Sequence, residues 1–315
     1  MPQDPSNLLD PLAIQRAEAL GLHARYVVEG YMAGEHKSPF RGFSIEFTQH
    51  REYVPGDDIR HLDWKVLGRT DRYYLKQYEQ ETNYVAHILL DGSESMKYGS
   101  GEKGMHGGAR KNSPPAPFCK FDYGKLMAAC LAYLILNQRD ATTVGLFDTS
   151  IRQHIPRTGN LASIHNIMST LAAFKPAQGT GIGGVLHQVA GQIRRKGIVI
   201  LISDLFDDEQ AILDGIQHLR FAGSEVIVFH TMDPYELEFP FAGNVEFDGL
   251  ETPSKLTTRP REIRKSYMKE LEGFQTRLRE GCERNSTHYV PVNTGHPLHE
   301  VLSGYLAFRL RTTTR

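Results

Sequence analysis

The sequence predicts an α/β protein: a doubly wound, mostly parallel sheet with a small β-rich N-terminal appendage. Short, nearly continuous apolar runs predict strands that are covered on both faces. Segments of helical periodicity alternate with these runs, as in βαβ units. A stretch dense in charge and tyrosine precedes the first run and predicts the appendage. We therefore divide the chain into an N-terminal helical segment at 1–39, the appendage at 40–82 and the α/β domain at 83–315.

The N-terminal part begins with a predicted helix over residues 8–33, where leucine, alanine and charged residues recur at helical spacing. Residues 40–47 predict a strand. In the region 51–81, the sequence Pro55-Gly56-Asp57-Asp58 predicts a turn between extended pieces. We expect Trp64 to pack between the appendage and the sheet.

The α/β region is predicted from the apolar runs and the amphipathic segments that separate them. The predicted strands are 84–90, 142–147, 198–202, 225–229 and 288–292. The predicted helices are 122–137, 161–174, 182–194, 209–221, 260–283 and 298–310. Residues 97–117 are rich in Gly, Lys, Ser and Pro and predict a mobile surface loop.

The composition disfavours several classes of protein. A formal net charge of −1 and a pI near 6.9 give no basic excess, so we expect no nucleic-acid partner. The longest apolar stretch, 126–136, is about half the ~20 residues that span a bilayer, and the N-terminus does not resemble a secretory signal. Three widely separated cysteines indicate neither a disulfide framework nor a zinc site. We expect a cytoplasmic protein without a membrane span.

The segment ILLDGSESM, residues 88–96, places oxygen-bearing side chains on a turn directly after a buried strand. Asp91, Ser93 and Ser95 supply one carboxylate and two hydroxyl groups. In open α/β sheets, ligands bind at the carboxyl ends of the strands. Such oxygens suit a hard cation such as Mg²⁺. The turn therefore predicts a divalent-cation site.

Two further elements supply oxygens to the same edge of the sheet. Thr180 lies between two glycines at the start of a predicted helix, and Asp204 follows the apolar run of 198–202. The carboxyl ends of parallel strands share one edge, so we expect five ligand residues from three loops: Asp91, Ser93, Ser95, Thr180 and Asp204.

These motifs carry two family resemblances. D-x-S-x-S, the loop threonine and the strand-ending aspartate resemble the metal-ion-dependent adhesion site of von Willebrand factor type A domains. Upstream, the pattern R-x-Y-x-x-G-D-D-x-R-x-x-D-W resembles the signature of the bacterial family DUF58, which precedes a type A-like domain. The resemblance spans roughly residues 20–230. The matching residues are Arg51, Tyr53, Gly56, Asp57, Asp58, Arg60, Asp63 and Trp64, followed by Arg69 and Glu81.

The resemblance implies a function and a role for each ligand residue. Ser93 and Ser95 would ligate Mg²⁺ (or Mn²⁺ or Ca²⁺) directly, Thr180 directly or through water, and Asp91 and Asp204 chiefly through water. An acidic residue of a partner protein would fill the open position. The family is linked with MoxR-type AAA+ ATPases, which implies an adaptor or chaperone-like partner of such an ATPase and no enzymatic activity. Many members carry transmembrane helices before the signature, unlike this sequence.

Several alternatives compete with this interpretation. The turn at 91–95 also suits a helix cap without metal. The segment 179–184 satisfies G-x-G-x-x-G, and Asp204 lies where a ribose-binding acid is expected, as in dinucleotide-binding proteins. Asp57, Asp58, His61 and Asp63 suit either a second metal cluster or a charged turn. The enzyme alternative is a Mg²⁺-dependent nucleotide- or phosphate-binding protein that uses the same edge of the sheet.

Overall fold

The computed structural model describes part of the chain, in two compact units. One unit comprises residues 35–83 and the other comprises 1–34 and 84–315. The N-terminal segment 1–39 with its predicted helix at 8–33, and most of the loop predicted at 97–117, lie outside the described residues. The described residues are 45–52, 63–70, 72–80, 85–101, 116, 118–177, 179–193, 197–251 and 255–313.

The described residues of the smaller unit form an antiparallel strand pair and a helix. The elements are β1 (Ile45–Glu52), α3 (Trp64–Thr70) and β2 (Tyr74–Gln80). The strand pair agrees with the predicted extended pieces, but α3 was not predicted. Asp63 begins this helix, since its Oδ1 accepts a hydrogen bond of 3.3 Å from the backbone N–H of Val66. Trp64 is 66% exposed, and its expected packing against the sheet of the other unit stays a prediction.

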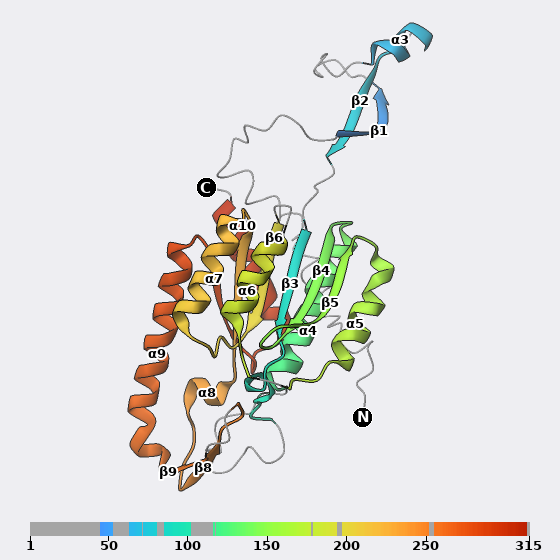
Figure 1. The fold of residues 1–315 in the computed structure, drawn as a ribbon. Coiled ribbons are helices and arrows are strands. Elements are labelled where there is room, and N and C mark those ends of the chain that lie inside the picture. The colour runs from blue at the N-terminus through green and yellow to red at the C-terminus, as the bar shows by residue number, and fades with distance from the viewer. Residues whose placement is uncertain are drawn as a thin grey trace. The chain divides into compact units, whose positions relative to one another are not determined.

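The larger unit is built on a six-stranded sheet with the order β10-β7-β6-β3-β4-β5. All neighbours are parallel except β4 and β5, which are antiparallel (Figure 1). This confirms the predicted doubly wound, mostly parallel sheet. The strands are β3 (Val85–Asp91), β4 (Ala141–Phe147), β5 (Ile151–Thr158), β6 (Gly197–Ser203), β7 (Glu225–Met232) and β10 (His288–Asn293).

Helices cover both faces of this sheet. One apolar core lies between the sheet and α4, α5 and α10, and a second lies between the sheet and α6, α7 and α9. On β3, Ile88 and Leu90 enter the first core while Leu89 enters the second, which explains its continuous apolar run. The helices are α4 (Lys120–Asn137), α5 (Ile164–Ala173), α6 (Ile182–Gln192), α7 (Glu209–Phe221), α9 (Pro260–Arg284) and α10 (Leu298–Thr313).

Gly183, within the segment 179–184, has a packing role together with Gly215 on α7. A Cβ on Gly183 would lie 2.8 Å from the backbone oxygen of Ala211, and one on Gly215 would lie 2.7 Å from the Cβ of Leu186. These glycines therefore allow α6 and α7 to approach closely. No strand precedes Gly179, because residues 174–177 form a loop after α5. The dinucleotide-binding alternative is wrong, since its fingerprint needs that strand.

Shorter elements lie beyond the carboxyl ends of the parallel strands (Figure 1). The aromatic residues Tyr235, Phe239 and Phe241 form a third apolar cluster there. The sequence did not predict the hairpin of β8 and β9. These elements are the 3-10 helix η3 (Ser95–Lys97), α8 (Pro234–Glu238), β8 (Val245–Asp248) and β9 (Lys255–Thr258).

Within the described ranges, no helix is both long and apolar enough to cross a bilayer.

Candidate metal centre

The sheet changes winding direction between β3 and β6. From β3 the chain continues to β4 on one side, whereas from β6 it continues to β7 on the other. Such a switch point opens a crevice at the carboxyl ends of the two strands, where ligands bind in this fold class. Asp91 is the last residue of β3, and Asp204 directly follows β6. The two predicted acidic ligands thus flank the switch point.

The turn after β3 is held by hydrogen bonds to Asp91, which is fully buried. Its Oδ1 accepts from the backbone N–H of Ser93 at 2.9 Å, and its Oδ2 accepts from Ser203 Oγ at 2.6 Å. Gly92 is needed because a Cβ there would lie 2.3 Å from the ring of Phe174. Ser203 was not predicted as a site residue, although it directly precedes Asp204.

The hydroxyl groups of Ser93 and Ser95 face one another, with their Oγ atoms 2.9 Å apart. Both residues are buried, and Ser95 begins the 3-10 helix η3. In octahedral Mg²⁺ coordination with bonds of about 2.1 Å, adjacent ligand oxygens are about 3 Å apart. The serine pair therefore fits two adjacent positions around one ion.

Asp204 already has a cationic partner within the chain. The Lys120 Nζ donates to Asp204 Oδ2 at 2.7 Å and to Glu236 Oε1 at 2.8 Å. Burial by itself lowers the pKa of Lys120, but the two carboxylates more than offset it and hold the pKa above its ordinary value. Lys120 begins α4 and Glu236 lies on α8. No local pattern marks this contact, because the partners are 84 and 116 residues away from Lys120.

Among the residues that the structure describes, no lysine or arginine pairs with Asp91. Burial raises the pKa of Asp91 to about 7, and the charge of Asp204 adds to this effect. The hydrogen bonds from Ser203 and Ser93 act in the opposite direction. The lysine thus leaves one of the two carboxylates poorly compensated, and a positive charge near Asp91 would stabilise its ionised form.

Thr180 lies on the loop before α6, which is attached to the ends of two strands. The backbone N–H of Gly181 donates at 3.1 Å to the backbone carbonyl oxygen of Asp148, which follows β4. The N–H of Ile182 donates at 2.7 Å to Oδ2 of Asp207, which follows β6. The hydroxyl of Thr180 donates to Glu251 Oε1 at 2.5 Å. Among the described residues, no hydrogen bond joins Thr180 to the other four predicted ligands.

The five predicted ligands therefore fall into three groups. Asp91, Ser93 and Ser95 are joined within one turn, Asp204 approaches Asp91 and binds Lys120, and Thr180 binds Glu251. In the described part of the chain, no three His, Cys, Asp or Glu side chains gather in metal-binding geometry. Asp57, Asp58 and His61 of the alternative cluster lie outside that part. A cation at this edge would thus depend on hydroxyl oxygens, which suit a hard ion.

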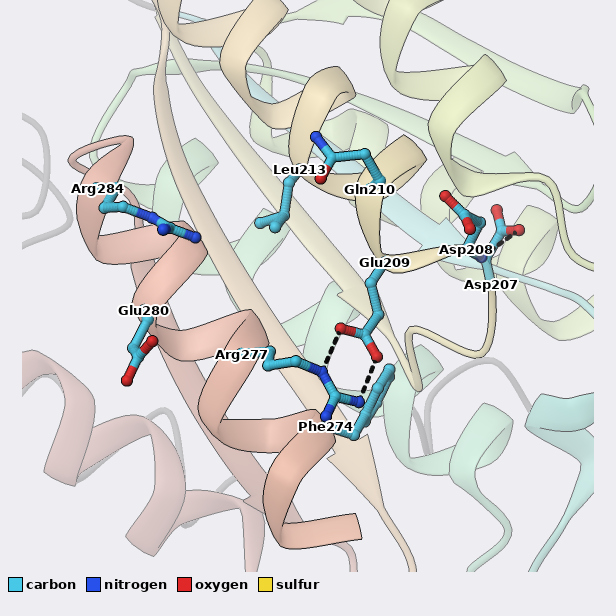
Figure 2. A pocket seen from close by; sticks show the side chains of 9 residues that line it. All are labelled: Asp207, Asp208, Glu209, Gln210, Leu213, Phe274, Arg277, Glu280 and Arg284. Atoms are coloured by element: carbon cyan, nitrogen blue, oxygen red, sulfur yellow. Dashed lines mark hydrogen bonds and ion pairs between the residues drawn. The ribbon is translucent and has the colours of Figure 1, made fainter. Parts of the chain in front are cut away.

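A separate pocket of about 680 Å³ opens between α7 and α9 (Figure 2). Within it, Arg277 donates to both carboxylate oxygens of Glu209, at 2.8 and 2.7 Å. The positive charge of Arg277 is thereby neutralised. Acidic residues outnumber the two arginines, which disfavours a phosphate ligand. The lining residues are Asp207, Asp208, Glu209, Gln210, Leu213, Phe274, Arg277, Glu280 and Arg284.

The fold and the oxygen-rich turn define an α/β domain with a candidate site at its topological switch point. Residues 49–277 match the DUF58 family, described as "Protein of unknown function DUF58". This match covers more than half of the chain, which therefore belongs to the DUF58 family. The chain is 24% identical over 251 residues to uncharacterized proteins of Mycobacterium tuberculosis (Rv1480) and Mycobacterium bovis (Mb1516). The aligned region covers 77% of this chain and 72% of each relative.

The chain is also similar to solved structures at low sequence identity. The conserved hypothetical protein BatB from Bacteroides thetaiotaomicron is 16% identical, with a TM-score of 0.41 over 72% of this chain and 99% of that one. The SpRpn10 VWA domain is 13% identical, with a TM-score of 0.40 over 71% of this chain and 95% of that one. The fold class of this chain is shown by its own strand order, β10-β7-β6-β3-β4-β5.

Proposed function

We propose that this chain is a protein-binding domain that depends on a divalent cation at the carboxyl edge of its sheet. The observation that supports it most is the 2.9 Å separation of Ser93 Oγ and Ser95 Oγ, which fits adjacent ligands of Mg²⁺. The proposed ion is Mg²⁺, with Mn²⁺ or Ca²⁺ as alternatives. When bound, the cation supplies a concentrated positive charge that attracts an acidic side chain.

The chain's own residues have different proposed roles at the ion. Ser93 and Ser95 are direct ligands, because their hydroxyl groups face one another. Asp91 holds the turn through both of its oxygens and contributes negative charge, as does Asp204. Thr180 approaches from the α6 loop as the fifth ligand, directly or through water.

The proposed partner is a protein that presents an acidic residue to the cation. The DUF58 resemblance implies a link with MoxR-type AAA+ ATPases. We therefore propose such an ATPase as the partner, and an adaptor or chaperone-like role for this chain.

The alternative function is a Mg²⁺-dependent enzyme that acts on a nucleotide or a phosphate ester. The candidate site supplies ligand oxygens, whereas catalysis also requires a general base near the ion. His230 interacts electrostatically with Asp204 and is 1% exposed, but burial lowers its pKa to about 4 and its Nδ1 hydrogen-bonds with the Tyr289 hydroxyl at 2.6 Å. A base with such a pKa is weak at neutral pH. These features favour binding over catalysis.

We expect binding of the purified full chain to a purified MoxR-type AAA+ ATPase from the same organism to require Mg²⁺. Surface plasmon resonance should show binding in Mg²⁺, loss of binding in EDTA, and loss in the Ser93→Ala, Ser95→Ala double variant, because each change removes the bridging ion. Ser150→Ala, an exposed serine at the same edge, is the matched control. Binding of equal strength in EDTA would contradict the proposal. Mg²⁺-dependent ATP hydrolysis that Asp91→Ala abolishes would favour the enzyme instead.

A further inference from the structure

Glu251 contacts the candidate site from a distant part of the chain. Its Oε1 accepts from the Thr180 hydroxyl at 2.5 Å, and its Oε2 accepts from the Thr180 backbone N–H at 3.3 Å. One carboxylate thus binds both donors of the residue proposed as the fifth metal ligand. Sequence analysis did not identify Glu251, which lies 71 positions after Thr180.

The β8–β9 hairpin carries Glu251 to this position. The Lys255 ammonium on β9 pairs with Glu246 at 2.7 Å and with Asp248 at 3.2 Å on β8, which connects the two strands. Phe247 stacks on Phe239 with ring centroids 5.8 Å apart, and Phe239 is part of the third apolar cluster. The aromatic contacts anchor β8 at the carboxyl edge of the sheet, and Glu251 follows β8 in the chain.

The charge of Glu251 is less compensated than that of its neighbours. At the same edge, Glu94 pairs with Lys97, Asp148 with Arg152 and Glu236 with Lys120. Among the described residues, no lysine or arginine forms an ion pair with Glu251, although it is partly buried. A partly buried carboxylate with hydroxyl and amide donors alone is stabilised by a nearby cation.

We propose that Glu251 is a carboxylate ligand of the cation, supplied by the chain itself. This inference rests on the proposed function, because it assumes that Thr180 and the serine pair bind an ion. Neighbouring oxygen ligands of one Mg²⁺ ion are about 3 Å apart. The Thr180 hydroxyl oxygen and Glu251 Oε1 are hydrogen-bonded, so these two oxygens are close enough to bind the same ion. Glu251 then occupies the position open to a partner, and the acidic residue of the partner must displace it.

Mn²⁺ is the probe that tests this inference. We expect Glu251→Gln to weaken Mn²⁺ binding to the purified full chain by about tenfold in calorimetry, because one charged ligand is lost. We also expect it to add one bound water to the ion, seen as a higher water-proton relaxation enhancement. Glu272→Gln, which changes an exposed carboxylate on α9, should change neither value. Circular dichroism confirms that each variant is folded.

Failure of this inference is distinguishable from failure of the proposed function. If Glu251→Gln matches the wild type in both affinity and relaxation while the Ser93→Ala, Ser95→Ala double variant loses Mn²⁺, the cation site stands and the role of Glu251 is refuted. If the wild-type chain binds no Mn²⁺, the proposed function and this inference are both refuted.

Discussion

Replacing Lys120 with methionine is expected to lower the free energy of unfolding by about 3–5 kcal/mol. Lys120 is 3% exposed and its ammonium is the shared partner of Asp204 and Glu236. Removal of the ammonium leaves the buried Asp204 carboxylate close to the partly exposed Glu236 carboxylate, without the cation that both of them share. The loss is large because the remaining charges are not resolvated, unlike those of an exposed ion pair.

Urea denaturation of the purified protein in EDTA measures this loss. Lys125→Met is the matched control on the same helix, because Lys125 pairs with Asp122, whose side chain remains 27% exposed. We expect the control to lose only about 1 kcal/mol. Saturating Mg²⁺ should restore part of the Lys120→Met loss, since the ion would compensate Asp204 in place of the ammonium. Similar losses for the two variants would contradict the role assigned to Lys120.

Replacing Asp91 with asparagine is expected to stabilise the metal-free protein at pH 8 by on the order of 1–4 kcal/mol. The pKa of Asp91 in the folded protein is about 7, above the reference value of 3.8. The folded state therefore binds a proton more tightly than the unfolded state, and stability falls as the pH rises from about 4 to 7. Asparagine removes this decline and is close in shape to aspartate, so the turn should persist.

The same substitution should weaken cation binding by at least about tenfold, because it removes one negative charge beside the ion. Denaturation in EDTA at pH 5 and pH 8 tests the effect on stability, and Mn²⁺ calorimetry tests the effect on affinity. Asp214→Asn, which removes an exposed carboxylate from α7, is the charge-matched control. An Asp91→Asn variant with the same pH dependence as the wild type would show that the buried charge is not destabilising.

The sheet could be predicted because its central strands are covered on both faces. β3 and β6 each contain a nearly continuous apolar run, and each strand was predicted within one residue of its observed ends. The edge strand β5 was missed because most of its side chains are exposed and only Ile155 is fully buried. The hairpin of β8 and β9 was missed for a similar reason, since each strand has four residues and is largely exposed.

The candidate site was predicted only where its residues are close in sequence or at strand ends. Asp91, Ser93 and Ser95 lie on one turn, and Asp204 lies at the end of a recognisable strand. Lys120 and Glu251 could not be found in this way, because each is brought to the site by tertiary packing of an element with no local sign of that contact. Tertiary packing also explains why residue 183 is a glycine. Gly183 belongs to a G-x-G-x-x-G pattern that resembles a phosphate-binding loop, but its lack of a Cβ leaves room for Ala211 of α7.

The central claim is that the serine turn binds a divalent cation, and isothermal titration calorimetry with Mg²⁺ and Mn²⁺ tests it most directly. The wild-type chain should bind one ion, with binding heats that the Ser93→Ala, Ser95→Ala double variant does not show. Ser150→Ala should bind as the wild type does. Indistinguishable heats for the wild type and the double variant would contradict the claim, whatever protein the chain binds.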